Sequence, residues 1–465
     1  MLINEKEIII PRVENHDGLL EYASAEVLKR LPQSEIPVRF VITHTSNQGY
    51  LCELGILSEI DDSLSCHRSS IFDYRKRSFE NVEKFNAVLL IPTGIGAEIG
   101  GHSGDGGPVA RLLASICDNL ITHPNVVNAA DINELPENAL YVEGSVLSRL
   151  LMGTIGLQKV RSNRIMLVID KHHDEFFHEA AINSVSAARA AFGIDCPVVV
   201  KMSDRVLMRS LFSGSGRAAG RIEYLECLCE VLEKHRSQYD AVALSSLIEV
   251  PSNLHEDYYR NDIEDMVNPW GGVEAMLTHT ISLLFDIPSA HSPMMESKEI
   301  LNLDVGVVDP RKSAEVVSTT YLHCILKGLH KSPRIINNPL VDIHSGLLTV
   351  TDISCLVIPD GCIGLPTLAA LEQGIPVIAV KENRNLMRNK LEELPFSPGK
   401  LFVVDNYLEA VGVMNTLKAG IAVESVRRPL AHTTVYEDEE SQDSSFRKAQ
   451  RESVSRRMNK DNYDR

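Results

Sequence analysis

The sequence predicts an α/β protein with a doubly wound, Rossmann-like parallel sheet. Short apolar runs alternate with longer amphipathic segments from residue 86 to residue 421, a pattern typical of strands covered on both faces by helices. In addition, the apolar run at residues 87–91 leads directly into a loop with seven glycines between Gly94 and Gly107, and a helical segment follows. Strand, glycine-rich loop and helix in this order form an anion or nucleotide cradle in α/β proteins.

The individual elements are expected in the following order. The first 84 residues contain a short amphipathic helix at 23–31 and a β-branched strand at 38–43. Further strands are expected at the short apolar runs 87–91, 164–170, 197–201, 241–248, 355–359, 376–380 and 402–404. Further helices are expected where apolar residues recur at helical spacing, at 109–120, 143–153, 174–192, 222–235, 272–285, 313–329, 366–373, 383–394 and 407–418.

Changes in composition predict four parts of the chain. We expect a small α/β N-terminal extension at 1–84, a main α/β domain with the glycine-rich loop at 85–340, and a second α/β lobe at 341–424. Residues 425–465 are densely charged and almost without apolar side chains. We expect this tail to be disordered, because it cannot bury enough apolar surface to fold.

The overall charge excludes some classes of partner. The formal net charge is −17, from 63 acidic and 46 basic residues, which argues against binding nucleic acid or an anionic membrane surface. Nine dispersed cysteines indicate reduced thiols. No apolar run is long enough to span a bilayer, and no signal-peptide pattern occurs. We therefore expect a cytoplasmic protein, and a homo-oligomer only because most proteins of this kind are oligomeric.

The glycine-rich loop is the first candidate binding site. Bare main-chain N–H groups at a helix N-terminus favour a phosphate or carboxylate. The spacing matches neither GxGxxG nor the P-loop, so the loop by itself does not specify a nucleotide. A tightly packed loop is the alternative interpretation. Asp105 is a candidate catalytic residue in this loop. The candidate ligand-binding residues are Thr93, Gly94, Gly96, Gly100, Gly101 and His102.

Three histidines in later segments are candidate catalytic residues. His123 precedes a proline and stands two residues before Asn125, a candidate ligand-binding residue. His279 lies in an expected helix, and His291 lies in a loop bracketed by prolines. The same three histidines are candidate ligands for a divalent metal, although no zinc-ligand spacing occurs. Hydrogen-bonded structural histidines are the alternative.

Four charged residues complete the predicted site. Glu143 opens an expected helix, so its carboxylate either transfers protons or stabilises the helix dipole. Arg311 could bind a carboxylate or phosphate with two N–H groups, or form an ion pair at a helix start. Asp360 follows an expected strand at a second glycine-containing junction, and Glu274 shares a helix with His279. Arg311, Asp360 and Glu274 are candidate ligand-binding residues.

Much of the chain resembles domain of unknown function 3326. The resemblance rests on segments that run in order across roughly residues 86–421, leaving the extension and the tail outside it. Where this family is expected to carry YAGD, the chain has His102-Ser-Gly-Asp105, which favours Asp105 over His102 as a catalytic residue. The family implies no activity. The main matching segments are PTGIGAEIGGHSGD (92–105), ITHPNVVNAADI (121–132), NALYVEGS (138–145), NPWGGVEAMLTHTI (268–281), IPSAHSP (287–293) and DPRKSAEVVSTTYLHCILKGL (309–329).

These observations favour an enzyme that acts on a small anionic or phosphorylated metabolite. Group transfer or hydrolysis is expected rather than redox chemistry, because no dinucleotide fingerprint occurs. A non-catalytic ligand-binding or regulatory protein is the first alternative. A two-lobed transferase similar to glycosyltransferases is the second, suggested by the junction around Asp360. An enzyme would bring its acid and base groups together in one pocket.

Overall fold

The computed structural model describes residues 1–13, 18–60, 69–260, 266–317, 320–337, 339 and 346–436. The chain divides into two compact units, Met1–Ile421 and Ala422–Arg465. All sheets and the candidate site belong to the first unit. Most of the expected tail, residues 437–465, lies outside the described residues.

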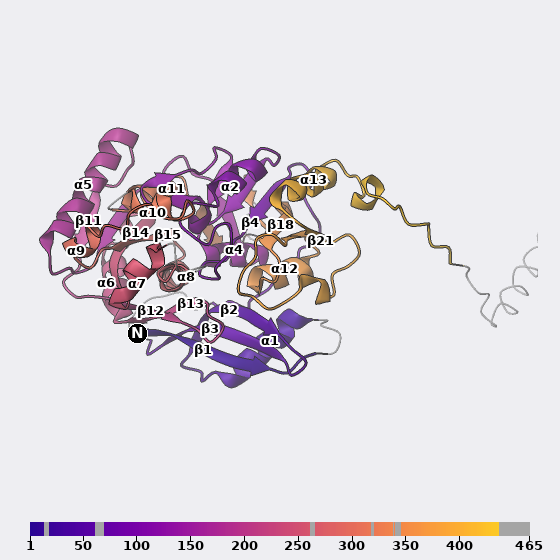
Figure 1. Cartoon of the computed structure of the whole chain (residues 1–465), viewed down its shortest axis with the longest axis horizontal. Coiled ribbons are helices and arrows are strands. Elements are labelled where there is room, and N and C mark those ends of the chain that lie inside the picture. The colour runs from indigo at the N-terminus through magenta and orange to yellow at the C-terminus, as the bar shows by residue number, and fades with distance from the viewer. Residues whose placement is uncertain are drawn as a thin grey trace, which may run out of the picture. The chain divides into compact units, whose positions relative to one another are not determined.

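A six-stranded parallel sheet carries the glycine-rich loop. Its strands follow the order β21-β20-β18-β4-β5-β8, and every neighbouring pair is parallel. The central strands consist of buried residues, which explains their apolar sequences. Figure 1 shows β4, β18 and β21 beside helices α12 (Leu365–Gln373) and α13 (Tyr407–Lys418). The strands are β4 (Asn86–Leu89), β5 (Asn119–Thr122), β8 (Ala139–Tyr141), β18 (Ile353–Pro359), β20 (Val377–Val380) and β21 (Leu401–Val404).

A ten-stranded mixed sheet forms the second layer. Its order is β11-β10-β14-β12-β13-β1-β3-β2-β19, and β15 also pairs with β14. The N-terminal strand β1 pairs with β13, so the first 84 residues share a sheet with residues of the expected main domain. The strands are β1 (Leu2–Ile10), β2 (Ile36–Thr45), β3 (Tyr50–Ser58), β10 (Ile165–Ile169), β11 (Val198–Lys201), β12 (Leu207–Phe212), β13 (Ala218–Glu223), β14 (Ala241–Glu249), β15 (Ser289–Met294) and β19 (Ile363–Gly364).

Two small antiparallel sheets complete the strands. One has the order β16-β9-β17, formed by Arg334–Asn337, Ile155–Gln158 and Leu347–Leu348. The other pairs β6 (Asn128–Ala129) with β7 (Ile132–Asn133).

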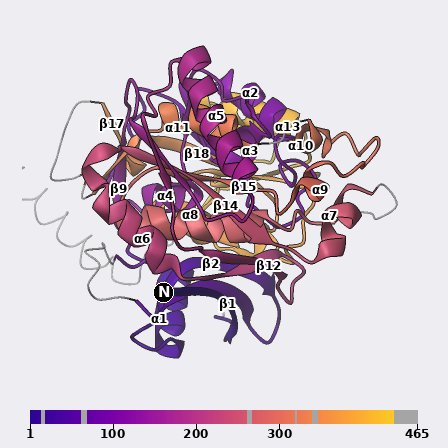
Figure 2. The same ribbon diagram turned by 90° about the vertical axis from the view of Figure 1, so that its left-hand side faces the viewer.

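Helix α8 (Gly271–Phe285) connects the two large sheets. It packs against β13, β15 and β2 of the mixed sheet and against helix α4 (Gly144–Leu151), which follows β8 of the parallel sheet. Figure 2 shows α8 above β2 and β12 and close to α4. Most of the α8 residues are buried, as expected for a helix covered on several sides.

The remaining helices cover the sheets or lie in the connections. Helix α13 contacts β20 and β21, and α12 contacts β19, β20 and α4. The remaining α-helices are α1 (Leu19–Arg30), α2 (Gly107–Ala114), α3 (Pro124–Val127), α5 (Glu175–Phe192), α6 (Leu225–Lys234), α7 (Ser252–Tyr259), α9 (Lys298–Leu301), α10 (Ser313–Val316), α11 (Leu322–His330), α12 (Leu365–Gln373) and α13 (Tyr407–Lys418).

The α/β class and all of the predicted strands are confirmed, but three helix predictions need correction. The helix predicted at 109–120 ends at Ala114, and its last residues belong to β5. The helix predicted at 313–329 is two helices, α10 and α11, separated by Tyr321 with a φ of 51°.

The helix predicted at 383–394 is wrong. This segment contains only a short 3-10 turn, Leu391–Glu393. Asn383 binds the main chain of Ile99 through both of its amide atoms. Asn389 donates to the carbonyls of Ile42 and Gly361. These long-range hydrogen bonds hold the segment in an extended loop, because asparagine competes effectively with helical hydrogen bonding.

Candidate functional site

A cavity of about 370 Å³ opens at the carboxyl edge of the parallel sheet. Ligands of parallel α/β sheets bind at this edge. The lining includes residues of the loops that follow β4, β5, β8 and β18, and residues of helices α8 and α10 and of strand β15. Those central to the site are Thr93, Ser103, His123, Asn125, Glu143, Trp270, Glu274, Thr278, His279, His291 and Glu315.

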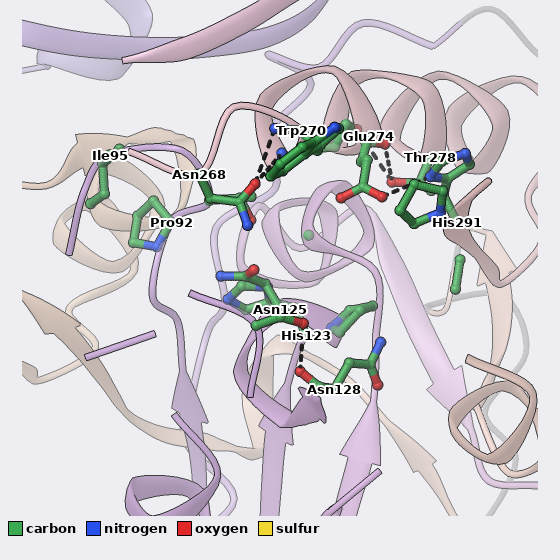
Figure 3. Close-up of a pocket in the computed structure, with 18 of the residues that line it drawn as sticks. Pro92, Ile95, His123, Asn125, Asn128, Asn268, Trp270, Glu274, Thr278 and His291 are labelled. Atoms are coloured by element: carbon green, nitrogen blue, oxygen red, sulfur yellow. Dashed lines mark hydrogen bonds and ion pairs between the residues drawn. The ribbon is translucent and has the colours of Figure 1, made fainter. Parts of the chain in front are cut away.

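Two groups of side chains face each other across this cavity. Figure 3 shows Trp270, Glu274 and Thr278 of α8 together with His291 on one side, and His123 and Asn125 on the other. Segments more than 140 residues apart therefore contribute to a single site. The structure brings together four of the five predicted catalytic residues: His123, Glu143, His279 and His291 line the same cavity.

Glu143 and His279 form a hydrogen-bonded acid–base pair. Glu143 caps helix α4, and its Oε2 accepts from the N–H groups of Ser145 and Val146 at 2.9 and 3.3 Å. Its Oε1 binds Nδ1 of His279, and the Thr278 hydroxyl lies 3.4 Å from the same oxygen. The two interpretations of Glu143 are therefore compatible: Oε2 caps helix α4, and Oε1 contacts the His279 ring for proton transfer.

The charge of Glu143 is stabilised by these contacts. Burial alone would raise its pKa, but the neighbouring His279 and the hydrogen bonds from His279 and Ser145 hold the pKa below its usual value. The His279 side chain keeps 17% exposure, and no partner of its Nε2 occurs among the described residues. This nitrogen is therefore available to a ligand in the cavity.

His123 is a neutral imidazole beside this pair. It is buried, and its Nε2 lies 3.2 Å from the main-chain nitrogen of Ile91. Because that N–H can only donate, Nε2 accepts and the ring carries its proton on Nδ1. Burial is the main cause that lowers the pKa of His123 to about 4; Glu143 opposes this shift, and His279 adds to it.

His291 lies in a second hydrogen-bonded chain. Its Nδ1 lies 2.9 Å from Oε1 of Glu274, and its Nε2 lies 2.8 Å from the hydroxyl of Ser246. The order Ser–His–Glu resembles a catalytic triad. However, Ser246 is buried, also contacts the sulfur of Met208 at 3.0 Å, and is not among the described residues that line the cavity. The arrangement therefore positions His291 and Glu274 and provides no accessible nucleophile.

The glycines of the loop are required mainly for packing. Gly94, Gly96 and Gly100 have positive φ, between 63° and 80°. A Cβ on Gly100 would lie 2.8 Å from Cδ1 of Ile91, and a Cβ on Gly101 would lie 2.0 Å from the Ala97 oxygen. None of these four glycines is among the described lining residues, whereas Thr93 is.

Asp105 and His102 lie behind the cavity wall. Neither is among the described lining residues. Oδ1 of Asp105 accepts from the Gly100 N–H at 2.9 Å, so the carboxylate stabilises the loop. Burial is the main cause that raises the pKa of Asp105 to about 7. Nδ1 of His102 lies 2.7 Å from the hydroxyl of Tyr258.

The two remaining binding candidates lie elsewhere. Arg311 forms ion pairs with Asp309 at 2.9 Å and with Glu98 at 3.2 Å, which matches its alternative interpretation as part of a helix-start ion pair. Asp360 accepts from the N–H of Gly361 at 2.9 Å. Neither Arg311 nor Asp360 is among the described lining residues.

Asn125, in contrast, lines the cavity, and its side chain donates to the Gly100 carbonyl at 2.7 Å.

The candidate metal ligands do not form a ligand set. Among the described residues, no group of three or more His, Cys, Asp and Glu side chains is placed to hold a metal ion. His123 is engaged at Nε2 by a main-chain N–H, and His291 is engaged at both nitrogens.

The structure adds site residues that the sequence reasoning missed. Trp270, the only tryptophan of the chain, lines the cavity next to the first turn of α8. Glu315 is 4% exposed and also lines it. A buried carboxylate inside a helical segment, such as Glu315, has no local sequence signal. The single tryptophan followed by Gly271 and Gly272 would have been a usable signal, because glycines permit close approach of a ligand to the backbone.

Comparison with known proteins shows similarity to proteins without an assigned activity. No solved structure matches the chain. An uncharacterized lipoprotein of Synechococcus sp. is 32% identical over 338 residues, covering 72% of this chain and 91% of that protein. A lipoprotein is attached to a membrane by its lipid, so this relative contradicts the cytoplasmic location predicted from the sequence, and that prediction is withdrawn.

Two further findings complete the comparison. No helix in the described part of the chain is long and apolar enough to cross a membrane. The family model described as "Protein of unknown function (DUF3326)" matches residues 86–427, which include the whole parallel sheet and most of the cavity. The chain therefore belongs to the DUF3326 family.

Proposed function

We propose that the protein is an enzyme that acts on a small anionic metabolite by proton transfer in the cavity, as a step of group transfer or hydrolysis. The observation that carries the proposal is the pair formed by Glu143 and His279. It combines a buried, ionised carboxylate with an imidazole whose other nitrogen is available to a ligand. This is the arrangement in which histidine acts as a general base.

The proton movements follow from the hydrogen bonds. Glu143 accepts from Nδ1–H of His279, which leaves the lone pair on Nε2. In the proposed step, Nε2 takes a proton from a substrate hydroxyl or from water, and the oxygen becomes the nucleophile. The imidazolium that forms is stabilised by Glu143 and later returns its proton to the leaving group.

Helix N-termini support the anionic character of the substrate. Gly271 is the first residue of α8, Gly364 precedes α12, and both line the cavity. The positive ends of these two helix dipoles therefore favour a negative group there, whereas the N-terminus of α4 is already capped by Glu143. Arg39 and Arg217 also line it, but they are paired with Glu5 and Glu53, so we propose a carboxylate or a single phosphate rather than a polyphosphate.

The order of the parallel strands supports a doubly wound, Rossmann-like sheet around this site. Numbered along the chain, β8-β5-β4-β18-β20-β21 reads 3-2-1-4-5-6, the order of dinucleotide-binding folds. The switch point then lies between β4 and β18. The loops after these two strands supply Thr93 and Cys362 to the cavity lining, in agreement with a ligand at the switch point.

The test begins with ligand binding and continues with turnover. Trp270 reports on the cavity without labelling, because it is the only tryptophan. Full-length protein is screened against a library of carboxylated and phosphorylated metabolites by tryptophan fluorescence, and each responding compound is then followed by mass spectrometry for consumption. The variants are His279→Asn, which retains a donor near Glu143 but lacks Nε2, and Glu143→Gln. His173→Asn, at an exposed position, is the matched control.

The proposal requires a defined pattern. A compound should bind to all four proteins, be consumed by the unchanged protein and the control, and be consumed at least about 100-fold more slowly by His279→Asn. Binding without consumption by any of them would replace the proposal with a ligand-binding protein. Equal consumption by His279→Asn would remove His279 from the mechanism.

A further inference from the structure

A second cluster of titratable side chains lies in the cavity wall, centred on Glu315 in α10. Its Oε1 accepts from the Ser103 N–H at 2.6 Å and from the Tyr258 hydroxyl at 3.1 Å. Longer contacts come from Asn268 at 3.4 Å and from the Tyr259 hydroxyl at 3.5 Å. All of these donors are uncharged. Glu315 thus differs from Glu143, which is bound by a histidine.

The hydroxyl of Tyr258 connects Glu315 with His102. It lies 2.7 Å from Nδ1 of His102 and 3.1 Å from Oε1 of Glu315. A tyrosine hydroxyl donates one hydrogen bond and accepts another. When Glu315 is ionised, His102 donates to Tyr258 and Tyr258 donates to Glu315. When Glu315 is protonated, both hydrogen bonds reverse direction and remain satisfied.

The charges around this chain favour proton exchange near neutral pH. Burial, with smaller contributions from Asp105 and Glu274, raises the pKa of Glu315 to about 7. The hydroxyl of Tyr321 donates to the main-chain carbonyl of Glu315 at 2.9 Å, so this hydrogen bond does not use the carboxylate as its acceptor.

Further polar groups lie beside Tyr258 and His102, at the end of the hydrogen-bonded series opposite Glu315. Nζ of Lys312 lies 4.6 Å from the centre of the Tyr258 ring and binds the carbonyl oxygen of Tyr258. The main-chain N–H of His102 binds the Asp105 carboxylate. The cation beside Tyr258 favours the ionised form of Glu315, and the carboxylate form of Asp105 beside His102 favours the protonated form of His102.

We propose that His102, Tyr258 and Glu315 form a proton relay between the glycine-rich loop and the cavity, and that Glu315 delivers the proton to the bound metabolite. The delivery rests on the proposed function, whereas the relay does not. In the delivery step, Glu315 starts ionised and His102 starts protonated on both ring nitrogens. Tyr258 takes the Nδ1 proton of His102 and gives its own hydroxyl proton to Glu315, and Glu315 passes that proton to the metabolite. His102 ends neutral and Glu315 ends ionised. The cavity would then contain a proton acceptor, His279, and a separate proton donor, Glu315.

The relay can be tested without a substrate. Full-length protein is labelled with ¹⁵N-histidine, and the ring nitrogens of His102 are followed by NMR between pH 5 and pH 9; the resonance is assigned with His102→Gln. The test variants are Glu315→Gln and Tyr258→Phe, which preserve side-chain shape. Tyr239→Phe is the control, since Tyr239 is also buried but its hydroxyl binds the main-chain carbonyl of Leu232.

The expected result is a coupled titration. Removing the carboxyl group of Glu315 should lower the midpoint of His102 by about one pH unit. Tyr258→Phe should also lower it, and Tyr239→Phe should not. An unchanged His102 midpoint in Glu315→Gln, or an equal shift in the control, would overturn the relay.

A second measurement separates the relay from the proposed function. The His102 midpoint should be the same in His279→Asn as in the unchanged protein. If the relay is present and no metabolite is consumed, the enzyme proposal fails and the relay stands. If turnover depends on His279 but the titration midpoint of His102 is unchanged in Glu315→Gln, the relay alone fails.

Discussion

The imidazole of His123 accepts a hydrogen bond from the main-chain N–H of Ile91, 3.2 Å away, at the point where the glycine-rich loop begins. Through this hydrogen bond, the side chain of His123, which follows β5, holds the backbone at Ile91, which follows β4. Since a protonated ring could not accept it, acid should break this contact and weaken the connection between the two loops.

The stability of the protein should therefore depend on His123 in mildly acidic solution. The pKa of His123 is about 4 in the folded protein against an ordinary 6.5, so the unfolded chain binds the extra proton between these values. The stabilisation is complete above pH 6.5 and is lost as the pH falls towards 4, by up to roughly 3 kcal/mol. His123→Gln retains an acceptor that cannot be protonated, and its stability should fall less between pH 6.5 and pH 4 than that of the unchanged protein.

Urea unfolding at several pH values measures this effect. His323→Gln is the control, because this half-buried histidine is bonded to the main-chain carbonyl of Ser184 and lies outside the described cavity lining. If the unchanged protein and His123→Gln lose stability in parallel on acidification, the neutral His123 does not contribute to the pH dependence.

The sequence predicted the strands better than it predicted the site. Runs such as Ile353–Pro359 are buried on both faces, so their composition alone indicates a strand. The strand Leu2–Ile10 escaped detection, because its polar and apolar residues are mixed and its pairing is long-range. The strand Tyr50–Ser58 was also missed, although it is largely apolar and pairs locally with Ile36–Thr45.

The candidate site depended even more on contacts distant in the chain. Glu143 and His279 are 136 residues apart, and each could be interpreted locally as a helix residue. Arg311 and the loop glycines had the local appearance of a binding site, and the structure engages them in an ion pair and in close packing. Residue type therefore indicated the candidates, but only the three-dimensional arrangement separates cavity residues from scaffold residues.

Asp105 should affect stability in the opposite direction to His123. Its pKa is raised from an ordinary 3.8 to about 7 in the folded protein. The folded state keeps a proton that the unfolded state loses in this interval, so the free energy of unfolding falls as the pH rises from about 4 to about 7. Asp105→Asn retains an oxygen that can accept from the Gly100 N–H and does not titrate.

The measurement compares Asp105→Asn with the unchanged protein at pH 5 and pH 8. Relative to the unchanged protein, the variant should gain at least about 1 kcal/mol of unfolding free energy between the two pH values. Asp118→Asn is the control, because this exposed carboxylate also accepts from a main-chain N–H, that of Phe85 at 2.8 Å. A gain no larger than that of the control would contradict a strongly raised pKa for Asp105.

The packing role of the glycine-rich loop leads to the third prediction. A Cβ on Gly101 would lie 2.0 Å from the carbonyl oxygen of Ala97, a main-chain atom that cannot move away without shifting the loop. Gly101→Ala should therefore lower the free energy of unfolding by roughly 2–3 kcal/mol.

Gly107 provides a control at the other end of the same loop. There a Cβ would lie 3.7 Å from Cβ of Glu134, an ordinary contact, and the residue begins helix α2. Gly107→Ala should change stability by less than about 1 kcal/mol, because the smaller unfolded-state freedom of alanine is offset by the cost of a Cβ in a helical residue before proline. Urea unfolding monitored by Trp270 fluorescence measures both variants in the same assay. If Gly101→Ala were as stable as Gly107→Ala, the close packing at Ala97 would not be what requires glycine, and close approach of a ligand would become the better explanation for this position.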